Sequence, residues 1–196
     1  RLLQRALAKS PGLRPTSAFA FGVALQDVLA EARRPGVDLI VVPQPAAVRA
    51  LSAGAGLEGR SGARRADDPD AETTDLVVLA VPSQTLRANL EDWASVLAPD
   101  AVLVSLMKGV ELGTLKRMSE VIAEITGAGP DRIAVVSGPN LSKEIARREP
   151  AASVVACADE SVAQQVQDRV HGSMFRPYTS VDVVGCEIGG AYKNVV

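Results

Sequence analysis

The feature that most constrains the fold is a series of short apolar runs, each followed by a helical pattern. Residues 76–81 form such a run, which Pro82 ends. A strand without a polar face is buried on both sides, as in a parallel sheet. Helices of about 10 to 15 residues between such strands indicate βαβ crossovers, which are right-handed. The pattern therefore predicts an α/β fold with a mainly parallel sheet.

The regular part of the pattern begins near residue 75. We expect strands at residues 76–81, 101–106, 133–136, 152–156 and 174–178, and helices at residues 83–97, 113–125 and 160–170, with a short helix around Ile145 and a last one opening at Asp182. Ser83 is a candidate cap for the first helix, and Leu115 is expected to face inward with the apolar residues that follow it. Ligands bind at the carboxyl ends of such strands. The loops that hold Pro82, Lys108 and Gly138 all follow strands, so we expect them along one rim of the sheet.

The first 73 residues are less regular. Residues 37–42 are expected to form a strand, residues 18–32 a helix and residues 52–72 a loop. The sequence Asp-Leu-Ile-Val-Val from Asp38 resembles Asp-Leu-Val-Val-Leu from Asp75, which fits either an internal repeat or two ordinary βα units. Residues 54–59 match G-x-G-x-x-G formally, but no buried strand directly precedes them, so they are a weak candidate for a phosphate loop.

Composition disfavours several classes of function. The net charge is −2 and no long basic run occurs, which argues against nucleic-acid binding. No apolar stretch reaches the roughly 20 residues of a membrane span. Cys157 and Cys186 lack a CxxC spacing, and Cys157 ends an apolar run typical of a core. Without a signal peptide, a cytoplasmic location is expected. His171 is the single histidine, which disfavours histidine-based metal sites and Ser-His-Asp triads.

Three stretches carry candidate chemistry, and each also has a purely structural explanation. Lys108-Gly109 places a cation at a strand end, where it can reach a phosphate, although a surface turn explains it too. Residues 137–140 precede a helix whose free N–H groups attract anions, or they simply cap it. Gly189-Gly190 lie inside a helix, where a glycine costs about 1 kcal/mol relative to alanine, so something must approach that backbone closely. Lys193 suits acid–base work in a dry cleft, or is exposed beside a tight helix crossing.

Together, five ordered segments resemble the bacterial NAD(P)-dependent glycerol-3-phosphate dehydrogenases. They are residues 75–85, residues 105–115, the SEVIAE run from Ser119, residues 137–147 and residues 182–196. The resemblance implies conversion of dihydroxyacetone phosphate and NAD(P)H to sn-glycerol 3-phosphate, the precursor of phospholipids. It implies Lys193 as the catalytic lysine. It further implies substrate binding by Lys108, Gly138, Asn140 and Lys193, and cofactor binding by Lys108, Ser142 and Pro82.

The resemblance also predicts the domain organisation. Residues 1–180 are expected to form a Rossmann-like, doubly wound dinucleotide-binding domain, with residues 1–73 atypical. Residues 181–196 are expected to be the first helix of an all-helical substrate domain, and a homodimer of the full-length protein is compatible with this. The family's first strand and GxGxWG loop are not found in residues 1–73, nor is its later phosphate-binding segment present. A shifted reading frame upstream of residue 74 would explain the first departure.

Two alternatives to a working enzyme of this family remain open. An inactive remnant of the family would bind no nucleotide. A related lysine-dependent dehydrogenase, such as a ketopantoate reductase or a sugar-nucleotide or 6-phosphogluconate type dehydrogenase, would share the architecture and differ in substrate. The choice between NAD and NADP depends on residues at the end of the second strand, which cannot be placed from the sequence.

Overall fold

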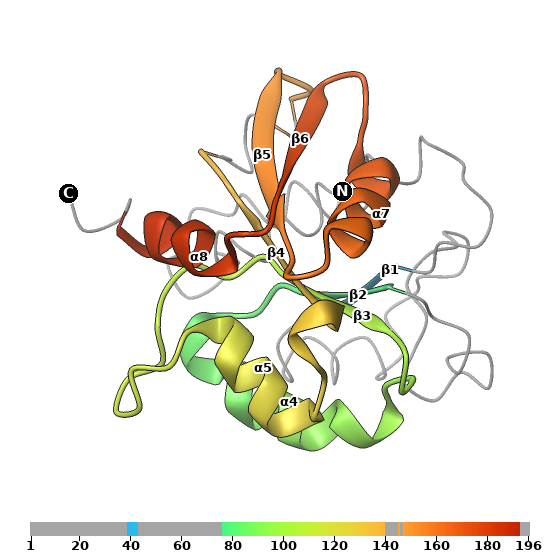
Figure 1. The fold of residues 1–196 in the computed structure, drawn as a ribbon. Helices are drawn as coiled ribbons and strands as arrows, with labels where there is room; N and C mark the ends of the chain where they lie inside the picture. The colour runs from blue at the N-terminus through green and yellow to red at the C-terminus, as the bar shows by residue number, and fades with distance from the viewer. Residues whose placement is uncertain (1–38, 43–75, 140–144, 146, 193–196) are drawn as a thin grey trace, which may run out of the picture.

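The computed structural model describes residues 39–42, 76–139, 145 and 147–192 (Figure 1). Within them, six strands form one sheet, in which the spatial order follows the chain. The strands are β1 (Leu39–Val42), β2 (Leu76–Leu79), β3 (Val102–Ser105), β4 (Ile133–Ser137), β5 (Ala151–Ala156) and β6 (Phe175–Ser180). Neighbours are parallel except β4 and β5, which are antiparallel. The predicted mainly parallel α/β sheet is confirmed, as are all of its predicted strands.

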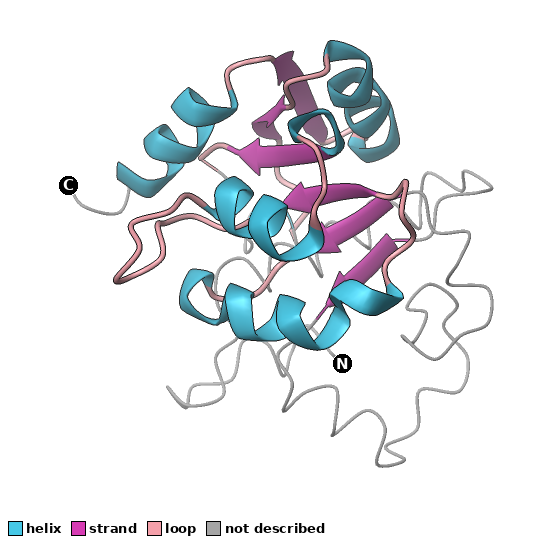
Figure 2. Ribbon diagram, turned by 60° about the horizontal axis from the view of Figure 1, so that its bottom comes forward, coloured by secondary structure: helices cyan, strands magenta, loops and turns pink. Residues whose placement is uncertain are grey.

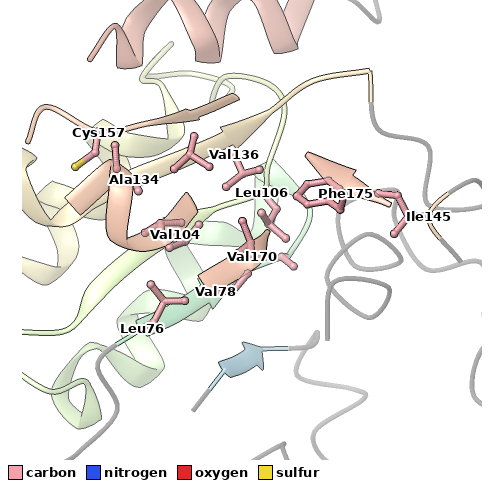
Figure 3. Packing of buried hydrophobic residues seen from close by; sticks show 14 residues of the cluster. Leu76, Val78, Val104, Leu106, Ala134, Val136, Ile145, Cys157, Val170 and Phe175 are labelled. Atoms are coloured by element: carbon pink, nitrogen blue, oxygen red, sulfur yellow. The ribbon is translucent and has the colours of Figure 1, made fainter. Parts of the chain in front are cut away.

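Strand β2 is buried on both faces, as its apolar run predicts. Successive side chains of a strand point to opposite faces. Leu76 and Val78 enter one core cluster, and Val77 and Leu79 enter the other; all four are at most 2% exposed. Figure 3 shows the first cluster, in which Phe175 lies beside Ile145 and Cys157 lies on the opposite side of the view. The predicted core position of Cys157 is confirmed.

Helices cover both faces of the sheet. Helices α4 (Leu86–Trp93) and α5 (Met118–Thr126) pack on one face and α7 (Glu160–Val170) on the other, while Figure 2 shows α4 and α5 side by side. Short 3-10 turns occupy Ser83–Thr85, Ala94–Val96 and Pro130–Arg132. Helix α7 has the predicted bounds, and it begins at Glu160 because the Asp159 carboxylate accepts the N–H of Ser161 at 2.7 Å.

Two predicted helix starts are wrong. Ser83 does not cap α4: a 3-10 turn intervenes, and Thr85 precedes α4 without a side-chain cap bond. Helix α5 begins at Met118 and not at Gly113, because Gly113 (φ 88°) and Leu115 (φ 57°) are in left-handed conformations that no α-helix contains. Leu115 is 73% exposed and does not face the core.

The last described helix, α8 (Val183–Tyr192), lies against β4 and β5. It begins after Asp182, as predicted, and the Asp182 carboxylate accepts the N–H of Gly185 at 2.8 Å.

Strand β1 confirms the strand predicted near residues 37–42, and Leu39 lies opposite Leu76 in a parallel register. The helix predicted at residues 18–32, the loop at 52–72 and the glycine pattern at 54–59 lie outside the described residues. Among the helices of the described segments, none has the length and apolarity needed to cross a membrane.

Burial of β2 on both faces yields a stability prediction. Leu76→Ala and Leu79→Ala remove side chains from opposite clusters, so each should lower the free energy of unfolding by about 2–5 kcal/mol. The control Leu112→Ala, at a position 75% exposed, should change it by less than about 0.5 kcal/mol. Urea unfolding followed by circular dichroism measures all three. If either core variant leaves the free energy of unfolding unchanged, the two-sided packing of β2 is contradicted.

Candidate functional site

The loops after β2, β3 and β4 meet at one edge of the sheet. These strands are mutually parallel, so their carboxyl ends lie together, as predicted. A Cβ built on Gly109 would lie 3.1 Å from the Ser83 Oγ, so the loops after β2 and β3 are in contact. The Lys108 Nζ donates to the carbonyl oxygen of Gly138 at 2.7 Å, which joins the loops after β3 and β4. We call this region, residues 82–83, 108–109 and 137–138, the carboxyl edge.

Lys108 brings a cation to the carboxyl edge. Its side chain is half-buried, and its ammonium group lies at the end of β4 through the bond to Gly138. An ammonium group has three N–H donors and suits phosphate and carbonyl oxygens. This contact confirms the prediction that the loops of Lys108 and Gly138 lie along one rim of the sheet. Which ligand they bind stays a prediction.

Gly138 has a structural reason to lack a side chain. A Cβ there would lie 2.9 Å from the carbonyl oxygen of Ala152 and 3.0 Å from the Cα of Ser153. Both atoms belong to the backbone of β5, which cannot move away easily. Close packing of β4 against β5 thus accounts for this glycine without any ligand.

The paired glycines of α8 differ from each other. A Cβ on Gly190 would lie 2.5 Å from the Ser137 Oγ and 3.6 Å from the Lys108 Cγ, whereas one on Gly189 would meet no atom of the described residues within 4 Å. The predicted close approach is confirmed for Gly190, whereas at Gly189 no described residue makes it. The group that approaches Gly190 is the end of β4 together with Lys108. Helix α8 is therefore part of the wall around the carboxyl edge.

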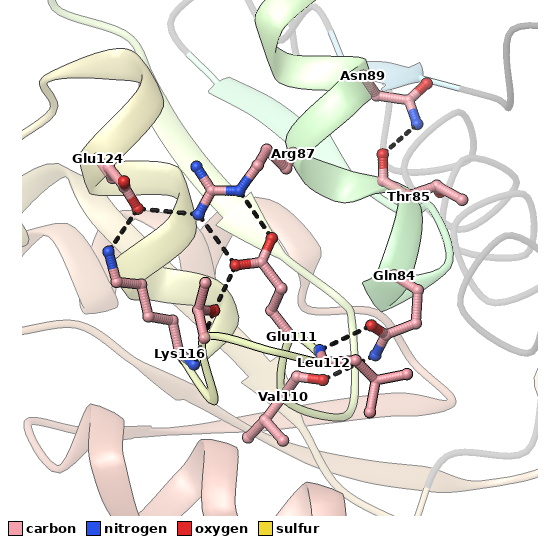
Figure 4. Close-up of polar contacts among 10 residues, drawn as sticks. Gln84, Thr85, Arg87, Asn89, Val110, Glu111, Leu112, Lys116 and Glu124 are labelled. Atoms are coloured by element: carbon pink, nitrogen blue, oxygen red, sulfur yellow. Dashed lines mark hydrogen bonds and ion pairs between the residues drawn. The ribbon is translucent and has the colours of Figure 1, made fainter.

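Residues 108–116, which we call the Lys108 loop, are fastened to the segment after β2 (Figure 4). The side-chain amide of Gln84 donates to the carbonyl oxygen of Val110 at 2.7 Å and accepts the N–H of Leu112 at 2.9 Å. Arg117, the residue directly after the loop, forms a β-bridge with Val110 near its start, and this bridge closes the loop. Sequence reasoning missed Gln84, although its place in the loop after a predicted strand, two residues beyond Pro82, is the signal that could have found it.

A cluster of charges holds the same loop against α4 and α5. Arg87 of α4 donates to both carboxylate oxygens of Glu111, at 2.8 and 2.9 Å, and to Glu124 of α5 at 2.9 Å. Lys116 pairs with Glu124 at 2.7 Å. The hydrogen bonds from Arg87, and then that from Thr114, lower the pKa of Glu111 from 4.5 to about 2. The Lys108 loop is thus fixed by ionic contacts that depend on a charged Glu111.

A buried carboxylate joins α8 to α5. Glu187 is 6% exposed and accepts hydrogen bonds from Ser119 and Arg117. Sequence reasoning did not assign Glu187 any partner. It is the single charged residue of α8, and that isolation is the signal that could have drawn attention to it.

Three residues of the predicted site cannot be located. Asn140, Ser142 and Lys193 lie outside the described residues, so their roles stay predictions. The last described residue of α8, Tyr192, directly precedes Lys193. Where the chain is described, no group of three or more His, Cys, Asp or Glu residues is placed to hold a metal ion.

Comparison with known families identifies the family of the chain. Residues 66–163, half of the 196 residues, match the model described as the N-terminus of NAD-dependent glycerol-3-phosphate dehydrogenase. The chain belongs to this family. The matched region contains the carboxyl edge from Pro82 to Gly138 and the whole Lys108 loop. The resemblance drawn from the sequence motifs is confirmed.

Curated relatives carry the same family name. The glycerol-3-phosphate dehydrogenase [NAD(P)+] of Streptomyces griseus is 71% identical over 122 residues, which are 62% of this chain and 36% of the relative. That of Streptomyces avermitilis is 61% identical over 143 residues, 72% of this chain and 43% of the relative. The chain thus spans well under half the length of these relatives.

The fold agrees with a solved structure of the family. The crystal structure of glycerol-3-phosphate dehydrogenase from Coxiella burnetii superposes with a TM-score of 0.72 and covers 90% of this chain and 55% of that one. The identity is 24%, so this likeness shows the fold alone. It confirms the Rossmann-like architecture predicted from the sequence.

The unequal glycines of α8 give a matched pair of variants. Gly189→Ala should raise the free energy of unfolding by up to about 1 kcal/mol, because alanine favours a helix and finds open space. Gly190→Ala should lower it by about 1–3 kcal/mol, because the new methyl group collides with Ser137. Adding Ser137→Ala should recover most of that loss in a double-mutant cycle. Urea unfolding of the four variants tests this, and equal effects at both glycines would contradict the packing.

The Glu111 contacts predict a pH dependence of the Lys108 loop. A carboxyl group whose pKa is lowered on folding stabilises the fold above its ordinary pKa, and that contribution is lost as the pH falls through the folded value. The loop should therefore stay fastened at pH 4.5 and loosen as the pH approaches 2. Carbon NMR of the Glu111 carboxyl group should show a midpoint of about 2. Arg87→Met should move the midpoint back toward 4.5, whereas Lys116→Met, which removes a weaker influence, should move it less.

Proposed function

We propose that this chain supplies the catalytic edge of an enzyme that interconverts dihydroxyacetone phosphate and sn-glycerol 3-phosphate with NAD or NADP. Membership of the family and the names of the curated relatives support this activity. The product is a precursor of phospholipids. The contact of the Lys108 ammonium group with Gly138 at the carboxyl edge, where α8 also packs, is the observation that carries the proposal.

The residues at the carboxyl edge fit a phosphate-bearing substrate and a dinucleotide. Parallel strands end here, and ligands of such sheets bind at that end. Lys108 offers a fixed positive charge to phosphate or carbonyl oxygens. A nicotinamide cofactor supplies hydride to the substrate carbonyl carbon. Under this proposal the cofactor is held by Pro82, Lys108 and Ser142, and the substrate by Lys108, Gly138, Asn140 and Lys193.

The proton step is assigned to Lys193. Reduction of a ketone to an alcohol requires a proton on the oxygen, and a lysine ammonium group can donate it. Helix α8 packs on the carboxyl edge through Gly190, and Lys193 follows its last described residue in sequence. In the reverse reaction the neutral amine takes the proton from the substrate hydroxyl group. Lys193 is therefore the proposed general acid and base.

The organisation of the whole protein belongs to the same proposal. Residues 1–180 would form the dinucleotide-binding domain, and α8 would open a helical substrate domain. A cytoplasmic location and a homodimer fit a small-molecule dehydrogenase. Binding of nucleic acid is not part of the proposal, because the net charge of −2 gives no electrostatic basis for it.

The proposed activity can be tested on the chain with two lysine variants. NADH binding is followed by fluorescence, and turnover by NADH oxidation with dihydroxyacetone phosphate. Lys193→Met should lower kcat by about 100- to 10,000-fold and leave NADH binding intact, because it removes the proton donor alone. Lys108→Met should weaken substrate binding as well, because it removes the cation from the carboxyl edge.

Lys116→Met is the matched control for Lys108→Met. It lies on the same loop, but its ammonium group forms an exposed pair with Glu124, and Arg87 still binds Glu111 and Glu124 without it. The kcat and KM should therefore change far less than in Lys108→Met. Absence of saturable NADH binding by the wild-type chain would refute the proposal and favour the inactive-remnant alternative. Turnover of 2-dehydropantoate in place of dihydroxyacetone phosphate would favour the related lysine-dependent reductases.

A further inference from the structure

Glu187 is a buried charge in a helix that is otherwise uncharged. Helix α8 reads Val-Val-Gly-Cys-Glu-Ile-Gly-Gly-Ala-Tyr, and the Glu187 side chain is 4% exposed. Removing a carboxylate from water is costly unless it is well paired, and apolar residues often serve stability equally well. A buried carboxylate at this point therefore calls for an explanation other than stability.

The partners of Glu187 all lie at the start of α5. One carboxylate oxygen accepts the backbone N–H of Ser119 at 2.9 Å. The other accepts the Ser119 hydroxyl group at 2.6 Å and Arg117 Nη1 at 2.7 Å. The first N–H groups of a helix have no partner within the helix and carry partial positive charge. Glu187 thus caps α5 from another helix, 68 residues further along the chain.

These bonds fix the position of α8 along its axis. Three donors approach two oxygens from one place, so a shift or rotation of α8 would break several bonds together. Residues three apart share a face of a helix, which puts Glu187 and Gly190 on the same side. The turn anchored by Glu187 is therefore the turn that packs on Ser137 and Lys108.

The same contact reaches the Lys108 loop. Arg117 pairs with Val110 in the β-bridge that closes the loop, and its guanidinium group donates to Glu187. One carboxylate thus connects the helix that precedes Lys193 with the loop that begins at Lys108. The two lysines proposed to act on one substrate come from these two elements.

We propose that Glu187 is a positioning residue that holds α8 in register with the carboxyl edge, so that Lys193 and Lys108 act on the same substrate. This inference rests on the proposed function for its consequence in turnover. The anchoring of α8 itself does not depend on that function, and it can be measured separately.

The test compares Glu187→Gln with the wild-type chain. The amide has the same shape but presents an NH₂ group to Arg117 and lacks the negative charge. A displacement of about 1 Å can lower turnover by about 100-fold, so kcat should fall by this order while KM and the NADH dissociation constant stay within about twofold. Hydrogen exchange should accelerate at the amides of α8 and at Ser119.

Two further variants separate positioning from stability. In Glu187→Gln the Arg117 guanidinium group keeps only the exposed Glu120 as a charged partner, at 3.1 Å. Adding Arg117→Met removes that part-buried charge, so stability should largely return while kcat stays low. Val166→Ala removes a buried side chain from α7, away from α8, and should lower stability without changing kcat. If kcat recovers with stability in the double variant, or if Glu187→Gln leaves kcat unchanged, the positioning role is overturned.

The two proposals can fail separately. If the wild-type chain does not turn over dihydroxyacetone phosphate, the proposed function is refuted, and hydrogen exchange alone decides the anchoring. Faster exchange confined to α8 and the start of α5 in Glu187→Gln then supports the anchoring. Unchanged exchange in α8 overturns it, whatever the activity.

Discussion

The whole site depends on one constraint: β2, β3 and β4 run parallel and are buried on both faces. The carboxyl ends of parallel strands lie at a single edge of the sheet. Three loops from different parts of the chain therefore meet there, and no separate contact between each pair of loops is needed to bring them together. Two-sided burial fixes the register, because a slip by one residue would exchange the two core faces. The loops that carry Lys108 and Gly138 therefore begin from rigid points. The hydrogen bonds within these loops then determine only the final positions of the side chains.

The elements around this edge are positioned by different kinds of force. Lys108 follows the buried strand β3 closely, and its loop is held in place by hydrogen bonds from Gln84 and by the Arg87–Glu111 ion pair. Helix α8 instead depends on one close contact, at Gly190, and on one buried carboxylate. Packing is non-directional, whereas hydrogen bonds fix direction. The combination gives α8 both a fixed distance and a fixed orientation at the carboxyl edge.

The fold was predictable where a local rule was sufficient. Apolar runs located β2, β3 and β4, and the alternating strand and helix pattern located α7, because such patterns are read over a few residues. The start of α5 was not predictable, since Leu115 has helical spacing but a left-handed backbone. The antiparallel direction of β5 was also hidden, because an apolar run is the same in either direction. At the site, the motifs identified Lys108 and the Gly138 loop, but the Cβ distances alone distinguished Gly190 from Gly189.

Glu187 illustrates what sequence patterns cannot show. A glutamate among small and apolar helix residues is ordinarily solvent-exposed, yet here it caps a helix that begins 69 residues earlier. Its partners are an Arg and a Ser that, read locally, belong to the start of α5 alone. Such a contact adds little net stability, because the hydrogen bonds mainly offset the loss of hydration. What it does provide is a single position for α8, since no other register satisfies the same donors. A charge buried at a junction between two elements is therefore better understood through the geometry that it imposes than through the stability that it contributes.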